Sequence, residues 1–174
     1  MRVVSGLYKG KQLAGFNIDG TRPTMDRVKE SLFGSIQNYL ENSVCLDLFA
    51  GSGSLGIEAL SNGAKKCYFV DHNREIIKIL ETNLNGIKNS VLIKDDYKNA
   101  LKKINEKLDI IFLDPPYQAN LIKPSIKELI ELDLLNDNAL IICEYQHEVI
   151  DLPFKLLKEK KYGDKNIKIY KKMS

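Results

Sequence analysis

The feature that most constrains the fold is a regular alternation of short apolar runs with amphipathic segments after residue 44. This periodicity predicts strands at 44–49, 67–71, 90–94, 108–113 and 139–144, and helices at about 54–62, 74–86, 97–106 and 121–133. Such an alternation implies right-handed βαβ units, and therefore a parallel sheet covered by helices on both faces. Two later strand-like segments, near 155–160 and 166–171, predict a hairpin that closes one edge of the sheet.

The first 43 residues stand outside this alternation. Residues 2–13 predict a small β-hairpin, and apolar residues at four-residue spacing predict a helix that Thr24 caps and that runs to Leu40. Lys29 lies off the apolar stripe of that helix. A chain of 174 residues is long enough for one core, so we expect a single domain, 1–174, with 1–43 as an extension within it.

A glycine-rich loop follows the first predicted strand of the alternation. Gly51, Gly53 and Gly56 have the spacing G-x-G-x-x-G and precede an apolar, helix-compatible segment. Glycine allows a ligand to approach the backbone closely, and the free N–H groups of a helix start can meet polar ligand atoms. The pattern alone suits NAD, FAD and S-adenosylmethionine equally well.

Acidic residues recur where the predicted strands end. Asp47, Asp71, Asp96 and Asp114 all fall at carboxyl ends of strands, where ligands of parallel sheets bind. Asp71 stands twenty residues after Gly51, which suits hydrogen bonds to a ribose diol. Either Asp95 or Asp96 could reach an adenine amino group. We favour Asp96, with Tyr97 shielding the ring.

The most specific pattern is Asp114-Pro115-Pro116-Tyr117 at the end of a strongly apolar run. Two prolines fix the backbone and remove two amide donors, which leaves carbonyl oxygens free to accept. A carboxylate beside a fixed carbonyl offers two acceptors for an exocyclic amino group, and Tyr117 can stack on the base that carries it. Acceptors placed out of the base plane favour a tetrahedral nitrogen whose lone pair can attack a methyl group, so the role is orientation and stabilisation.

Composition indicates an ordinary globular protein with basic ends. The net charge is +3, but residues 1–13 carry Arg2, Lys9 and Lys11 without an acid, and residues 151–174 carry eight lysines against three acids. These ends suggest a surface for a polyanion, or simply solvated termini.

Three cysteines without C-x-x-C spacing predict buried reduced thiols and no metal site. No membrane span or secretory signal is visible, so we expect a cytoplasmic protein.

The motifs together resemble a known family. Residues 47–56 with 114–117 resemble class I S-adenosylmethionine-dependent amino-methyltransferases. Residues 2–6, 9–13 and 21–33 narrow the resemblance to the RsmD family of bacterial 16S ribosomal RNA guanine-N2 methyltransferases. The resemblance implies an α/β, Rossmann-like, seven-stranded, mostly parallel sheet with an antiparallel last strand. The usual crossover helix between the fifth and sixth strands is expected to be reduced to a turn.

The resemblance also implies roles for matching residues. The cofactor would be S-adenosylmethionine, bound by Arg22, Pro23, Thr24, Asp47, Phe49, Ala50, Gly51, Ser52, Gly53, Asp71, Asp96 and Tyr97. Catalysis would fall to Asp114, Pro115, Pro116 and Tyr117, which would hold a guanine flipped out of the RNA. Arg2, Lys9 and Lys11 would contact RNA phosphates. We expect the partner to be 16S ribosomal RNA within a partly or fully assembled small subunit.

Four other functions are weighed against this one. An adenine-N6 DNA methyltransferase shares the Asp-Pro-Pro-Tyr motif, but the chain leaves little room for a target-recognition domain. A glutamine-directed protein methyltransferase is disfavoured only by the N-terminal pattern. A non-catalytic RNA-binding or ribosome-assembly factor has no need of intact glycines, Asp71 and Asp114. An NAD-dependent dehydrogenase would leave the double proline without a purpose.

Overall fold

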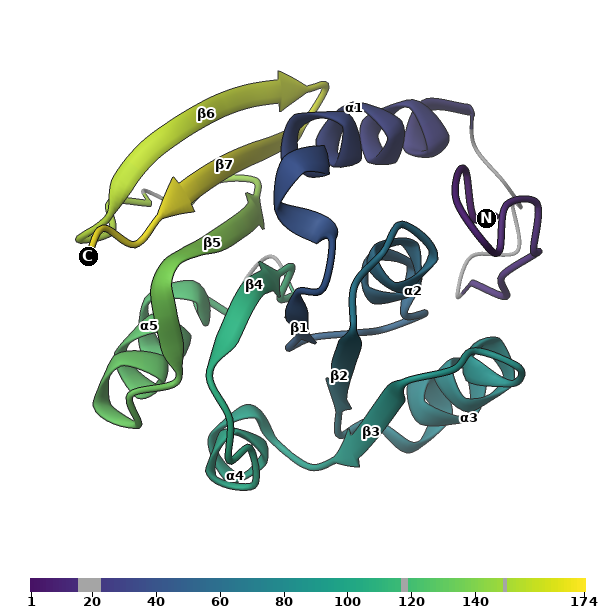
Figure 1. Cartoon of the computed structure of the whole chain (residues 1–174), viewed down its shortest axis with the longest axis horizontal. Helices are drawn as coiled ribbons and strands as arrows, with labels where there is room; N and C mark the ends of the chain where they lie inside the picture. Colours follow the sequence, from purple (N-terminus) through teal and green to yellow (C-terminus); the bar gives the residue numbers. More distant parts are fainter. Residues whose placement is uncertain (16–22, 117–118, 149) are drawn as a thin grey trace.

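The computed structural model describes residues 1–15, 23–116, 119–148 and 150–174. Its helices are α1 (Pro23–Leu40), α2 (Ser54–Ser61), α3 (Arg74–Leu84), α4 (Tyr97–Lys102) and α5 (Ile122–Glu131). Its strands are β1 (Val44–Asp47), β2 (Lys66–Asp71), β3 (Ser90–Lys94), β4 (Leu108–Leu113), β5 (Leu135–Tyr145), β6 (Lys155–Tyr162) and β7 (Lys165–Lys171). The alternation predicted from the sequence is therefore confirmed (Figure 1).

The described strands form one sheet in the order β3-β2-β1-β4-β5-β7-β6. Strands β1 to β5 pair in parallel, while β7 is antiparallel to both β5 and β6. Among these strands β7 alone runs the opposite way, so the prediction of a mostly parallel sheet with an antiparallel last strand is confirmed. The sheet order places β1 and β4, which precede the glycine loop and the Asp-Pro-Pro motif, side by side.

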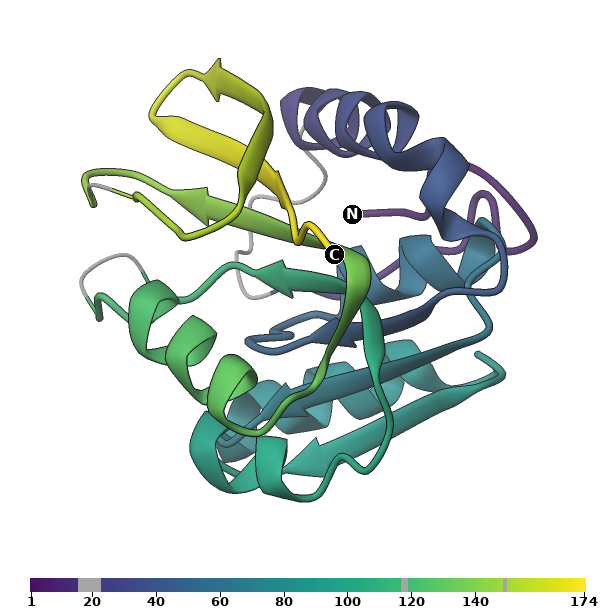
Figure 2. The same cartoon turned by 60° about the vertical axis from the view of Figure 1, so that its left-hand side comes forward.

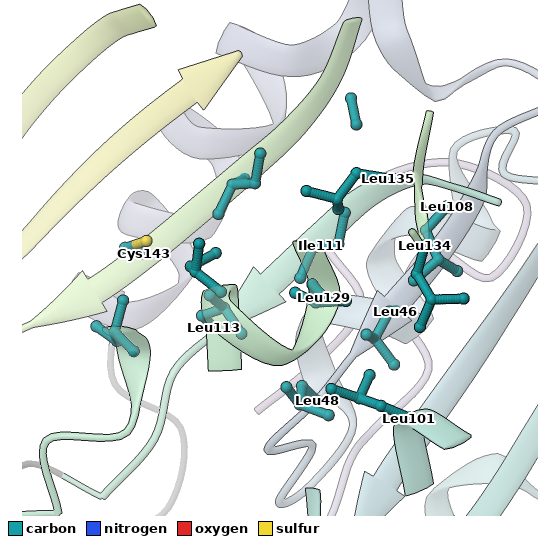
Figure 3. Packing of buried hydrophobic residues seen from close by; sticks show 14 of the residues in the cluster. Leu46, Leu48, Leu101, Leu108, Ile111, Leu113, Leu129, Leu134, Leu135 and Cys143 are labelled. Carbon is teal, nitrogen blue, oxygen red and sulfur yellow. The ribbon is translucent and has the colours of Figure 1, made fainter. Parts of the chain in front are cut away.

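The core lies on both faces of the sheet because successive strand residues point in opposite directions. In β4, Ile111 and Leu113 pack into the cluster that includes α4 and α5, whereas Ile110 and Phe112 pack into the cluster that includes α1, α2 and α3. Figure 3 shows the first cluster, in which Leu113 lies near Cys143 of β5. Cys143 and the other two cysteines are free and buried, as predicted.

Several element boundaries differ from the prediction; helix α4, for example, ends at Lys102 rather than near residue 106. Strand β5 begins at Leu135, four residues earlier than expected. Its first residues include a polar stretch, which does not show the apolar pattern of a buried strand. Asn136 of that stretch donates to Asp109 Oδ1 at 2.8 Å, which explains how polar residues are accommodated there. Helix α1 begins at Pro23, so Thr24 lies in the first turn and the predicted N-cap is wrong. Proline suits a first helical position because its missing N–H would have no partner there.

The connection from β5 to β6 contains no helix in residues 146–148 and 150–154, as expected. The β6–β7 hairpin lies against α1 (Figures 1 and 2). Lys158 of β6 donates to Ser35 Oγ at 2.7 Å, and the Tyr162 hydroxyl donates to Ser31 Oγ at 2.7 Å. These contacts fix the hairpin beside the carboxyl end of the sheet.

The N-terminal hairpin is present in a reduced form. A single antiparallel bridge joins Arg2 and Gln12, and the rest of the segment is turns. Its contacts are made with α2: Leu7 N donates to Ser61 O at 2.8 Å, and Gly6 has a φ of +83°. A Cβ on Gly6 would lie 2.0 Å from that Ser61 oxygen, so the close approach requires glycine.

Candidate functional site

The glycine loop joins β1 to α2 through left-handed backbone. Gly51 and Gly53 have φ values of 57° and 82°, which a side chain would strain. Asp47, the last residue of β1, is buried and accepts from Gly56 N at 3.0 Å. Burial, the largest cause, raises the pKa of Asp47 to about 7, against the lowering effect of the Gly56 amide. The buried carboxyl group of Asp47 therefore holds the glycine loop in place through the Gly56 amide.

Asp71 occupies the end of β2 and faces the same loop. Its Oδ2 accepts from Gly51 N at 3.1 Å, and its Oδ1 accepts from His72 N at 2.9 Å and Asn73 N at 3.1 Å. Asp71 does not cap the following helix, because Asn73 caps α3 with its own side chain. Asp71 is thus a half-buried carboxylate held at the strand end where the sequence predicted it.

The next strand end carries Asp95, Asp96 and Tyr97. Asp96 caps α4 and accepts from Asn99 N at 2.9 Å, whereas Asp95 forms an ion pair with Lys103 at 2.9 Å. The Tyr97 ring lies 6.0 Å from the ring of Phe49 in the glycine loop, centroid to centroid. Two predicted cofactor residues, Phe49 and Tyr97, are thereby brought together.

The Asp-Pro-Pro motif directly follows β4. Pro115 is buried and Pro116 is exposed, while Tyr117 lies outside the described residues. The Pro116 carbonyl already accepts from Ala119 N at 3.0 Å. Among the described residues, none donates a hydrogen bond to the Pro115 carbonyl.

Sequence reasoning missed Glu144 as a site residue. Glu144 lies near the end of β5 and lines the same cavity as Asp114, and its Oε1 lies 2.7 Å from Lys165 Nζ. Burial first, and then the charge of Glu144, raise the pKa of Asp114 well above its usual range. The rule that ligands bind at the carboxyl ends of parallel strands pointed to Asp114, and it applies equally to Glu144 near the end of β5.

An open cavity of about 640 Å³ brings these elements together. Of the predicted residues it is lined by Asp47, Phe49, Ala50, Ser52 and Asp114. Residues of α1, Glu144 of β5 and Lys165 of β7 complete the wall. Asp71, Asp96 and Tyr97 lie beyond this cavity, at the neighbouring strand ends. Arg22 is outside the described residues, and nothing is described of the side chains of Pro23 and Thr24.

Lys29 does not project into solvent as its place off the apolar stripe suggested. It is 6% exposed, and its Nζ lies 3.2 Å from Glu58 Oε1 and 2.8 Å from Ser54 Oγ. Burial lowers the pKa of Lys29, and the nearby Glu58 carboxylate opposes this effect. Glu58 is fully buried and also accepts from Val4 N and Ser5 N, both at 3.0 Å. This ion pair joins α1, α2 and the N-terminal segment.

The three residues predicted to bind RNA differ in their exposure and in their contacts within the protein. Arg2 is 55% exposed and pairs with Asp26 at 3.2 Å. Lys11 donates to the Asn85 carbonyl at 3.2 Å, and Lys9 is exposed. Strand β6 adds a second basic surface, because its exposed residues include Lys155, Lys158, Lys160 and Lys161.

The described residues give no indication of a membrane span or a metal centre. None of their helices is long and apolar enough to cross a membrane. Within the same part of the chain, no three His, Cys, Asp or Glu side chains are grouped so as to hold a metal ion.

The sheet order, the glycine loop and the acids at the ends of β1, β2 and β4 define a Rossmann-like methyltransferase fold. Residues 1–171 match the family model described as conserved hypothetical protein 95. The chain belongs to this family, which is the RsmD family resembled by its motifs.

Curated relatives and solved structures agree with this assignment. Ribosomal RNA small subunit methyltransferase D of Haemophilus influenzae is 39% identical over 98% of this chain and 93% of its own length. The protein of the same name from Escherichia coli is 32% identical, over 99% of this chain and 90% of its own. The solved structure of the candidate methyltransferase yhhF from Escherichia coli superposes with a TM-score of 0.88, at 32% identity, covering 99% of this chain and 98% of that one.

Proposed function

We propose that this protein transfers a methyl group from S-adenosylmethionine to the exocyclic N2 amino group of a guanine in 16S ribosomal RNA. The observation that carries the proposal is the position of Asp114. Its carboxyl group and the Pro115 carbonyl, to which no described residue donates, follow β4, and Asp114 lines a cavity that the glycine loop also lines. Two acceptors beside a cofactor loop suit an amino group that is to be methylated.

The residues present fit the cofactor. The cavity volume of about 640 Å³ lies within the range of about 300–1,000 Å³ typical of small-molecule sites. Asp47 with residues 49–53 would hold the methionine part, Asp71 the ribose and Asp96 the adenine, beside the paired rings of Phe49 and Tyr97. Bound there, S-adenosylmethionine supplies an electrophilic methyl group. The cofactor contacts predicted for Arg22, Pro23 and Thr24 are part of the same proposal.

Asp114 and Pro115 orient the acceptor. The exocyclic amine of guanine has its lone pair delocalised into the ring, and hydrogen bonds from its N–H groups to fixed oxygens favour the tetrahedral nitrogen that can react. Such acceptors are most effective when they are preorganised, because they need no rearrangement during the reaction. The double proline provides this rigidity, and Tyr117 would stack on the flipped base.

Charge and relatives support an RNA partner. Two described surfaces carry exposed basic side chains: the N-terminal segment with Arg2 and Lys9, and strand β6 with its four lysines. Phosphate contacts of this kind supply much of the affinity for nucleic acids and position the protein without reading sequence. Relatives of similar length are named for methylation of small-subunit ribosomal RNA. We place the reaction on 16S RNA within a partly or fully assembled small subunit, in the cytoplasm.

A methyl-transfer assay with labelled S-adenosylmethionine tests the proposal. The substrates are small-subunit particles from cells that lack the enzyme, naked 16S RNA and unmethylated DNA, and each product is digested to nucleosides. Label in N2-methylguanosine from the particle is expected. Label in N6-methyladenine from DNA would replace the proposed substrate, and label in no nucleic acid despite cofactor binding would favour a protein substrate or an assembly factor.

A further inference from the structure

Asp114 and Glu144 form a pair of carboxyl groups at the ends of adjacent strands. The β4–β5 register places Leu113 opposite Cys143, so the next residues along the two strands are Asp114 and Glu144. Both side chains line the cavity, and Glu144 raises the pKa of Asp114 through its charge and through a side-chain hydrogen bond. A hydrogen bond between two carboxyl groups requires a proton, and two ionised carboxylates at this separation repel each other. The pair therefore holds one proton between its members.

Lys165 determines where that proton resides. Its Nζ lies 2.7 Å from Glu144 Oε1, so its positive charge lies beside Glu144, and in our proposal the shared proton stays on Asp114. Burial of Asp114 acts in the same direction, because it raises the pKa of this carboxyl group. Asp114 then donates its proton to Glu144 and keeps its carbonyl oxygen as an acceptor.

Other charged or titratable groups border the cavity around the pair. Among the described residues these are Asp26, Lys29, Asp47, Tyr162, Asp164 and Met1 with its amino terminus. Asp47 raises the pKa of Asp114 further, while Lys165 lowers it. The salt bridge of Lys165 is made to Glu144, and the charge of Lys165 also acts on Asp114 directly.

On the basis of the proposed function, we propose that Glu144, held by Lys165, is a positioning residue that acts through Asp114 and receives its proton during methyl transfer. The methyl group leaves the sulfonium sulfur, which keeps the electron pair of the broken C–S bond, and the N2 lone pair forms the new N–C bond. The proton lost from N2 passes to the free oxygen of Asp114 as the Asp114 proton passes to Glu144. The pair ends neutral, and Glu144 returns its proton to water in the open cavity.

Substitutions of Glu144 separate this role from a structural one. Glu144→Gln keeps the shape but cannot accept a proton, so kcat for methylation of the particle is expected to fall about 10²-fold with KM unchanged. Glu144→Asp is shorter but still accepts a proton, and it should retain more activity than the Gln variant. Lys165→Met should also lower kcat, and Glu131→Gln, an exposed carboxyl change on α5, is the matched control. If Glu144→Gln were more active than Glu144→Asp, the role of Glu144 would be structural and no proton transfer would be needed.

Carbon-13 NMR of the aspartate carboxyl groups gives a readout that does not depend on activity. Asp114, assigned by comparison with Asp114→Asn, should keep its proton to a higher pH in the wild type than in Glu144→Gln. Equal titration of Asp114 in both proteins, with equal kcat, would overturn the relay. A wild-type protein that methylates no guanine refutes the proposed function instead, and the NMR result still decides whether the two carboxyl groups share a proton.

Discussion

The carboxylate of Asp71 accepts a hydrogen bond from the backbone of Gly51, with Asp71 Oδ2 3.1 Å from the Gly51 nitrogen. The last residue of β2 therefore fixes the glycine loop after β1, twenty residues earlier in the chain. Its other oxygen is held by the amides of His72 and Asn73. One side chain thus shapes the loop and occupies the position proposed for ribose binding.

Asp71→Ala is expected to weaken S-adenosylmethionine binding by about tenfold to hundredfold, because hydrogen bonds to a charged group are worth about 1.5–3 kcal/mol. Isothermal titration calorimetry measures this directly. Asp95→Ala is the control, because Asp95 is the neighbouring strand-end acid and is paired with Lys103. Unchanged affinity in the Asp71 variant would refute the ribose assignment, and a loss in the Asp95 variant would move the adenine contact from Asp96 to Asp95.

Asp114→Ala is expected to lower methyl transfer by at least about 10²-fold, because it removes a preorganised acceptor for the target amine. Cofactor affinity by calorimetry should remain that of the wild type, since the proposed cofactor contacts are made by other strand ends. Turnover close to that of the wild type would rule out the proposed catalytic role of Asp114.

Gly56→Ala and Gly34→Ala form a matched pair. A Cβ on Gly56 would lie 2.4 Å from Phe69 Cε1 and 2.8 Å from Cys67 Sγ, whereas a Cβ on Gly34 of α1 would meet nothing within 4 Å. Overpacking typically costs about 1–3 kcal/mol, and Gly to Ala within a helix typically gains about 0.5–1 kcal/mol. Denaturant unfolding should therefore show opposite changes. Equal stability of the two variants would mean that α2 can move away from β2.

The buried carboxyl group of Asp47 should make stability depend on pH. Its pKa rises from 3.8 to about 7 in the folded protein. Between these values the folded state keeps a proton that the unfolded chain has released, so its contribution to stability is present below the unfolded pKa and is lost as the pH rises.

Asp47→Asn removes this dependence, and its Oδ1 can still accept from Gly56 N. Urea unfolding of both proteins at several pH values between 4.5 and 7.5 measures the difference. The free energy of unfolding of the wild type should fall with pH, relative to that of the variant, by a few kcal/mol. Parallel pH profiles would show that Asp47 is ionised in the folded protein.

The exposed lysines of β6 should contribute to RNA binding through phosphate contacts. Lys155→Ala with Lys161→Ala is expected to weaken particle binding and to reduce the slope of log K against log salt by about one for each contact removed. Filter binding at several salt concentrations measures both quantities. Lys78→Ala, an exposed lysine of α3, is the control. An unchanged slope would exclude β6 from the RNA interface.

Local patterns were sufficient for most of the fold. Hydrophobic periodicity located every helix and strand of the alternation, and strand-end acids located Asp47, Asp71 and Asp114. Periodicity reports only the apolar face of an element. It therefore could not show that Lys29 is buried, because its partner Glu58 lies on another helix. Glu144 was missed for a similar reason: its importance comes from Asp114 and Lys165, which only the folded sheet brings beside it.

The attachment of the N-terminal segment to Glu58 has a consequence for the order of events during synthesis. Val4 and Ser5 reach their acceptor only after more than fifty further residues have been added, since their bonds to Glu58 span 54 and 53 positions. The segment that carries Val4 and Ser5 is synthesised before α2 and must therefore wait for α2 before it can dock. Arg2 and Lys9 would then take up their final places only after the glycine loop exists.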